Sequence, residues 1–156
     1  MLIINEVSSQ TSSYGELQAA YIYNFAKYTT WPQKLDTFKI AILGNTSIMN
    51  DLKKILKGKK ILTYEIVLQQ IKSIEEIKDF QMVYLPSSSS KDLEPLLKAG
   101  SNKNILIVTE DDLAKQGACI SFFIEDERLK FKINRSMLQK FGLKAADGLL
   151  KLGVLL

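Results

Sequence analysis

The sequence predicts an α/β fold: a layered α/β sandwich in which a mixed, mostly parallel sheet is flanked by helices and ends in a C-terminal antiparallel hairpin. Between residues 38 and 117, short apolar runs alternate with segments of helical period, which is typical of parallel strands joined by crossover helices. The runs at residues 118–124 and 129–133 then flank a polar turn, which is typical of a hairpin.

The first element is an aromatic and nearly uncharged helix, expected over residues 15–30. It ends before Pro32, because the residue that precedes a proline is held out of the α region. Asn24 is set inside its aromatic stretch. Burying an unpaired amide costs about 1–3 kcal/mol, so we expect a fixed hydrogen-bond partner for Asn24. A strand follows at residues 38–43 and ends at Gly44.

The middle of the chain continues the alternation. A helix with apolar residues at helical spacing over residues 48–56 ends at Gly58, and a β-branched run follows at residues 61–68. Ser73 and Glu76 then have the spacing of a capping box, so a short helix is expected to begin there.

The third strand is expected at residues 80–85. The helix after it begins near Asp92, because Pro95 is tolerated only in a first turn. A further strand, of the kind buried on both faces, follows at residues 104–108. Thr109 can cap the short acidic helix that comes next.

Gly117 ends that helix, and the hairpin begins. In its second strand, Leu129, Phe131 and Ile133 share one face, because side chains alternate across a strand. Asn134 stands at the corner between this strand and a helix and is an N-cap candidate.

Two final helices are expected, at residues 135–141 and from Ala145 to the end, with Gly142 between them. The tail at residues 149–156 is apolar enough to need a partner surface, which is either the chain's own sheet or another chain.

The chain of 156 residues is long enough for one domain with a hydrophobic core, which we place at residues 14–156. Residues 1–13 are expected to form a leader or a flexible tether. The first residues lack the basic start of a signal peptide, and no stretch has the length of a membrane span. Either the protein is cytoplasmic, or the chain is a mature form whose export signal has been removed.

The net charge of +4 is mild, and the densest basic run, at residues 53–60, is interpreted as a solvated helix face and turn. Nucleic acid is not expected as a partner, because arginine occurs only at Arg128 and Arg135.

No catalytic set can be assembled from the sequence, so we do not expect an enzyme. The chain has no histidine, which excludes serine and cysteine triads and imidazole zinc sites. The single cysteine, Cys119, is interpreted as a buried structural thiol. Neither residues 110–112 nor residues 125–127 have the spacing of a calcium loop, so no metal is expected. No cofactor is expected either, because no nucleotide-binding fingerprint is present.

A small ligand could bind beyond the carboxyl ends of the parallel strands, where glycine allows close approach and hydroxyls with helix N-terminal amides can hold an anion. Turn and capping chemistry is the simpler explanation of these residues. The candidate ligand-binding residues are Gly44, Asn45, Ser87, Ser88 and Thr109.

Five segments of the chain form a pattern in a fixed order: residues 18–27 with Trp31-Pro32, residues 38–44, residues 117–122, residues 128–134 and residues 142–153. Taken together, these segments resemble the motifs of the YfiR family of bacterial periplasmic regulators. The similarity extends from Glu16 to the end of the chain. The family's second glycine is replaced by Ala118, and its Ile-Ser-Ser by residues 145–147, which alters the surface near that corner.

The resemblance implies a non-catalytic periplasmic protein that binds the sensory domain of a membrane signalling protein, of the diguanylate cyclase type, and represses it. It also implies a possible homodimer. Disulfides support the fold or the dimer in relatives with more cysteines, whereas this chain must rely on packing. The residues expected to contact the partner are Phe131, Ile133, Asn134, Arg135 and Leu143. The alternative function is a small-molecule sensor that uses the crevice at the strand carboxyl ends.

Overall fold

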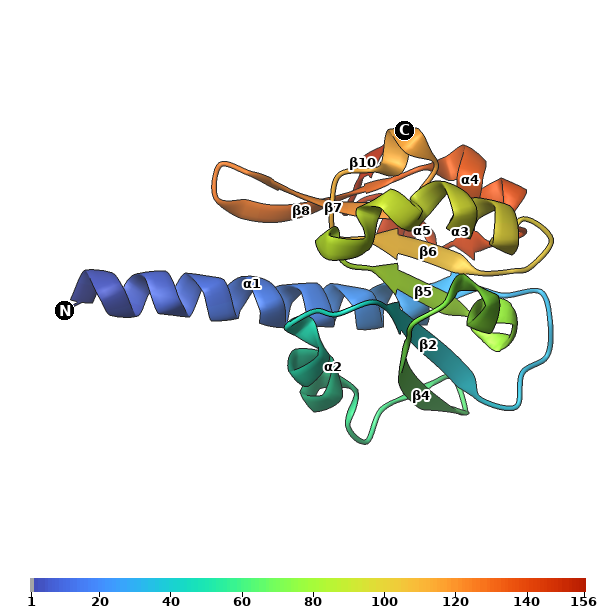
Figure 1. The fold of residues 1–156 in the computed structure, drawn as a ribbon, viewed down its shortest axis with the longest axis horizontal. Helices are drawn as coiled ribbons and strands as arrows, with labels where there is room; N and C mark the ends of the chain where they lie inside the picture. The colour runs from blue at the N-terminus through green and yellow to red at the C-terminus, as the bar shows by residue number, and fades with distance from the viewer. Residues whose placement is uncertain (1) are drawn as a thin grey trace.

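The computed structural model describes the backbone of residues 2–156 and the side chains of residues 14–156. In this part of the chain, eight strands form one mixed sheet in the order β10-β8-β7-β6-β5-β2-β4-β3, flanked by helices (Figure 1). This confirms the predicted α/β sandwich. The leader or tether expected at residues 1–13 falls on residues whose side chains lie outside this description.

The elements follow one another in the expected alternation. The helices, with the 3-10 helices labelled η, are α1 (Leu2–Lys27), α2 (Ile48–Leu56), η1 (Ile74–Asp79), η2 (Ser87–Asp92), α3 (Leu93–Gly100), η3 (Ala114–Gln116), α4 (Arg135–Lys140) and α5 (Asp147–Leu150). The strands are β1 (Thr29–Thr30), β2 (Phe38–Leu43), β3 (Lys60–Ile61), β4 (Tyr64–Ile71), β5 (Met82–Leu85), β6 (Leu106–Thr109), β7 (Ile120–Glu125), β8 (Arg128–Ile133), β9 (Lys144–Ala145) and β10 (Val154–Leu155).

The centre of the sheet is parallel and fully buried. β5 pairs with β2 on one side and with β6 on the other, and Met82 lies opposite both Ile40 and Leu106. Every residue of β5 and β6 is buried, as expected for strands that are covered on both faces.

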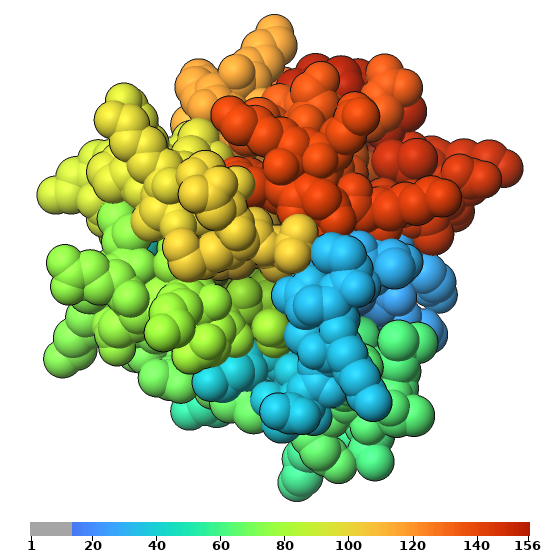
Figure 2. All heavy atoms as spheres, turned by 90° about the vertical axis from the view of Figure 1, so that its right-hand side faces the viewer, coloured from blue at the N-terminus to red at the C-terminus, as the bar shows by residue number. Residues whose placement is uncertain are grey.

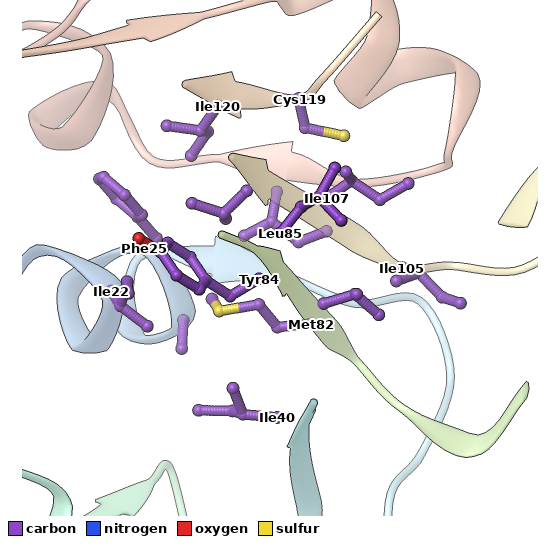
Figure 3. Close-up of a cluster of buried hydrophobic side chains, with 14 of the residues drawn as sticks. Ile22, Phe25, Ile40, Met82, Tyr84, Leu85, Ile105, Ile107, Cys119 and Ile120 are labelled. Carbon is purple, nitrogen blue, oxygen red and sulfur yellow. The ribbon is translucent and has the colours of Figure 1, made fainter. Parts of the chain in front are cut away.

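One face of this sheet packs against α1, which in turn packs against α2, and α3 packs with η1. The close-up in Figure 3 shows Ile22 and Phe25 of α1 beside Met82 and Tyr84 of β5. Side chains alternate along each strand, so Cys119, next to the α1-facing Ile120, points to the opposite face (Figure 3).

An aromatic cluster joins α1 to the hairpin of β7 and β8. The ring centroid of Phe25 lies 4.9 Å from that of Phe131 and 5.6 Å from that of Phe122. Tyr21 lies 5.2 Å from Phe131, in an edge-on arrangement. Such pairs contribute about 0.5–1.5 kcal/mol each beyond the area they bury. The Tyr14 hydroxyl adds a hydrogen bond to the Glu127 carbonyl at the hairpin turn.

Trp31, which follows α1, contacts the amino ends of three neighbouring strands of the sheet. Its indole N–H donates to the carbonyl oxygens of Gln81 and Asn104, at 3.2 and 3.0 Å. Its ring meets Phe38 edge-on, at 4.9 Å between centroids. One side chain therefore holds together the first residue of β2 and the residues just before β5 and β6.

The C-terminal tail differs from the expected helix. α5 has four residues, and the chain then turns at Gly153 into β10, which pairs in parallel with β8. The Leu156 N–H donates to the Ile133 carbonyl at 2.9 Å. A strand forms here because the outer edge of β8 would otherwise leave unpaired backbone groups.

Three smaller expectations were wrong. The run at residues 61–68 divides between β3 and β4. Thr109 does not cap a helix, since it is buried and its hydroxyl lies 2.7 Å from the Ser121 hydroxyl. Asn24 is half-buried, and its side chain makes no hydrogen bond within residues 14–156. The capping box of Ser73 and the left-handed Gly117 at the end of η3 are confirmed.

We expect Tyr84→Phe to raise the free energy of unfolding by about 1 kcal/mol. The Tyr84 side chain is fully buried, and its hydroxyl has no hydrogen-bond partner within the described residues, so the substitution removes an unsatisfied group without changing the shape of the core. Urea denaturation at neutral pH measures the difference.

The same pair of proteins tests the ionisation of this group. Burial, together with the nearby carboxylates of Glu110 and Asp111, raises the pKa of Tyr84 well above its usual value. In the unfolded chain a tyrosine ionises at about pH 10, whereas in the folded chain Tyr84 stays neutral. The wild type therefore loses stability relative to Tyr84→Phe as the pH rises above this value. If the free energies of unfolding of the two proteins change in parallel above this pH, Tyr84 does not have a raised pKa in the folded chain.

Candidate interaction surface

The last strand of the chain lies at an exposed edge of the sheet. β10 places Val154 opposite Lys132 and Leu155 opposite Ile133, and Arg135 donates from Nε to the Leu156 carbonyl at 3.2 Å. An exposed edge strand presents backbone groups and side chains to other chains.

The tail can reach β8 because residue 153 is a glycine. A Cβ atom at Gly153 would lie 2.7 Å from Cε2 of Phe131 and 3.0 Å from Cδ1 of Ile133. Any larger residue would push the tail away from these buried side chains. The position of the edge therefore depends on the packing beneath it.

Apolar side chains are exposed along this tail. Leu152 is 70% exposed, Val154 45% and Leu155 39%, and Tyr28 of α1 is 43% exposed. A groove of about 340 Å³ lies between α1 and α5, beside Tyr28 and Leu152. We call this groove and the three tail residues the C-terminal apolar patch. The groove is lined by Tyr21, Asn24, Tyr28, Gly148, Leu149 and Leu152.

The residues that the sequence placed at the partner contact lie beside this patch, mostly beneath the surface. Phe131, Ile133 and Leu143 are buried within the chain. Asn134 caps α4, since its Oδ1 accepts from the Met137 N–H at 3.1 Å. Of the five, Arg135 exposes its side chain.

The topology also brings the predicted ligand-binding residues together, at the carboxyl ends of the central strands. β2, β5 and β6 are neighbouring parallel strands, so their carboxyl ends lie side by side. The residues found at these carboxyl ends are Gly44, Asn45, Ser87, Ser88 and Thr109.

Serine hydrogen-bond donors at these carboxyl ends already donate to groups of the same chain. Ser87 and Ser90 donate to the two carboxylate oxygens of Asp111, each at 2.6 Å. The Ser87 N–H donates to Glu110 at 2.8 Å. An anion would therefore meet two carboxylates and occupied hydroxyls.

A second hollow lies at the opposite end of the strands, where the sequence suggested no site. It has a volume of about 140 Å³ and is bordered by Lys27, Thr29, Trp31, Phe38 and Tyr64, among others. Thr29 is 7% exposed, and its hydroxyl has no hydrogen-bond partner within the described residues. Residues 27–38 and residues 61–64, which are distant in sequence, line this hollow together.

Residues 14–156 contain no group of three or more acidic, histidine or cysteine side chains that could hold a metal ion. Cys119 is buried, and burial raises the pKa of its thiol to about 12. No helix of the described chain is long and apolar enough to cross a membrane.

Comparisons with known proteins identify the domain. Residues 15–154 match the sequence model of a family described as YfiR/HmsC-like (DUF4154). No curated protein matches the chain. A similar solved structure is that of a conserved domain protein from Vibrio cholerae O1 biovar El Tor, with 9% identity and a TM-score of 0.59. The alignment covers 88% of this chain and 59% of that one, so the likeness shows the fold alone.

We expect Asn134 to have a structural role: it caps α4 and so fixes the position of Arg135, the first residue of that helix. Its Nδ2 also donates to the Ala114 carbonyl at 2.7 Å. Asn134→Ala should lower the free energy of unfolding by about 1–2 kcal/mol, because both bonds are lost. Asn134→Ser should lower it less, because a serine hydroxyl can still cap the helix. Equal stability of all three proteins in urea would contradict this role.

Proposed function

The chain belongs to the YfiR/HmsC-like family, and on that premise we propose that it is a non-catalytic periplasmic regulator that binds the sensory domain of a membrane signalling protein and represses it. The family is regulatory and non-enzymatic, and membership is consistent with a role in diguanylate cyclase signalling. The proposed target is therefore a diguanylate cyclase or a related sensor.

The C-terminal apolar patch is the single observation that most supports a protein partner. Leu152 lines the groove that α1 and α5 leave open, and Val154 and Leu155 follow it at the sheet edge, with their side chains on opposite faces of β10. Apolar side chains exposed around a groove are typical of interaction surfaces. Lys151 and Arg135 at its border provide the polar rim that such surfaces usually have.

Repression by a bound protein requires a difference in affinity. The regulator must bind the inactive state of its target more tightly than the active state, by a few kcal/mol, to shift the population. An edge strand with an adjacent groove can recognise one arrangement of a partner segment, since both backbone pairing and side-chain burial must fit.

We expect Leu152→Asp to weaken binding of the target's periplasmic domain by about thirtyfold or more, because a charge would replace an apolar anchor. Arg135→Glu should weaken it less, since a rim charge mainly affects the association rate. Capture from detergent-solubilised membranes identifies the target, and titration calorimetry then measures the affinity.

Leu62→Asp is the matched control, because Leu62 is 84% exposed and follows β3 at the opposite edge of the sheet. All variants must keep the wild-type circular dichroism spectrum. If a folded Leu152→Asp protein binds the target as the wild type does, the patch is not the contact surface.

The second candidate function is small-molecule sensing. For this function, the hollow next to Thr29 is a better binding site than the crevice at the carboxyl ends of the strands. A buried hydroxyl without a partner, near the cationic Lys27, suits a small molecule with an acceptor group. The volume is close to that of a cavity that accommodates one benzene ring.

Thr29→Val tests this second function. Without ligand the variant should be more stable than the wild type by about 1 kcal/mol, because valine has the same shape and no hydroxyl to satisfy. In a thermal-shift screen of small carboxylates, a ligand at a hundred times its dissociation constant should stabilise the wild type by about 2.7 kcal/mol, and the variant by less. A screen without any stabilising compound would count against sensing.

A further inference from the structure

One short segment of the chain carries a net charge of +4. Residues 53–65 contain five lysines and one glutamate, which equals the whole net charge of +4. The rest of the chain has 16 basic and 16 acidic residues. Its own basic run, at residues 128–140, has five cations and no acidic residue, but Lys130 and Lys132 in that run form ion pairs with Glu125 and Asp112. The segment runs from the end of α2 through β3 into β4, at the lower end of the molecule in Figures 1 and 2.

All five of these lysines are exposed: Lys53, Lys54, Lys57, Lys59 and Lys60. Within the described residues, Lys60 is paired with Glu65 at 3.3 Å, and the other four form no ion pair. Lys53 and Lys54 lie in the last turn of α2, where cations complement the helix dipole. The helix does not account for the three lysines that follow it.

Leu62 stands at the tip of the same segment. It belongs to the two-residue turn between Ile61 and Tyr64, which face each other across β3 and β4. Its φ is 54°, in the left-handed region where a leucine is strained and glycine or asparagine is usual. Leu62 borders the hollow next to Thr29, but with 84% of its side chain exposed it gains little from the fold. An apolar residue at a strained, exposed position indicates a role outside the chain.

We propose that this lysine tip, formed by the five lysines and Leu62, binds the surface of a membrane that contains anionic lipids. The lysines lie near the lipid phosphates, and Leu62 enters the headgroup region. A nucleic acid fits less well, because the tip has no arginine and an aliphatic side chain gains little against a duplex.

The location of the tip leaves the C-terminal apolar patch free. β3 and β10 are the two edges of the sheet, and the C-terminal residues lie near the top of Figure 2, away from the tip. A chain bound through the lysine tip would be held at the membrane with its opposite edge available. The inference goes beyond the proposed regulation and does not depend on the identity of the target.

Flotation of the full chain with lipid vesicles tests the proposal. We expect binding to phosphatidylcholine vesicles that contain phosphatidylglycerol, little binding without it, and a steep loss as salt is raised. Each lysine near the surface contributes about fivefold to the partition constant, so Lys57→Gln, Lys59→Gln and Lys60→Gln together should lower it about a hundredfold. Leu62→Asn should lower it by about three- to tenfold and leave the fold intact, since asparagine suits a positive φ.

The matched control replaces three other exposed lysines, Lys91, Lys98 and Lys115, with glutamine. It removes the same net charge and should keep vesicle binding close to the wild type. Equal losses in both triple variants would show a non-specific charge effect and overturn the proposal. No binding to anionic vesicles at low salt, or tighter binding to a DNA duplex in the same buffer, would also overturn it.

Discussion

The packing of α1 across the sheet is the contact on which the rest of this structure depends. The parallel strands β2, β5 and β6 place Ile40, Met82 and Tyr84 on one face, where α1 covers them. The same helix reaches the hairpin through the cluster of Tyr21, Phe25, Phe122 and Phe131. One helix therefore joins the parallel and the antiparallel parts of the sheet. The chain has no disulfide, so burial of apolar side chains is the largest favourable contribution to its free energy of folding.

The two edges of the sheet follow from that arrangement and differ in chemistry. At one edge, a short apolar strand is held by Gly153 against Phe131 and leaves Leu152 exposed beside a groove. At the other edge, five exposed lysines precede a strained leucine turn. The buried centre is similar in kind to that of any α/β domain, so the edges are where this chain can be specific. An apolar edge suits a protein partner, and a basic edge suits an anionic surface.

Much of the fold could be predicted because local patterns and tertiary packing agree. The strand at residues 38–43 matches β2 residue for residue, and the amphipathic stretch after it is α2. The hairpin, the Ser73 capping box and the Asn134 cap depend on neighbours close in sequence. The site was harder to predict. Phe131 and Ile133 were expected at a partner contact, yet a strand pattern shows which side chains share a face and not what covers that face.

The sequence by itself determined the α/β class, the family and most of the order of the elements between residues 38 and 140, because periodicity, turn residues and motifs are local properties of the chain. Only the tertiary structure decided that the tail is a strand, because a free edge of β8 must find hydrogen-bond partners. Only the tertiary structure decided that the hydroxyls after β5 bind Asp111, and that Thr29 borders a hollow. These facts depend on contacts between distant residues, and no pattern within one segment encodes them.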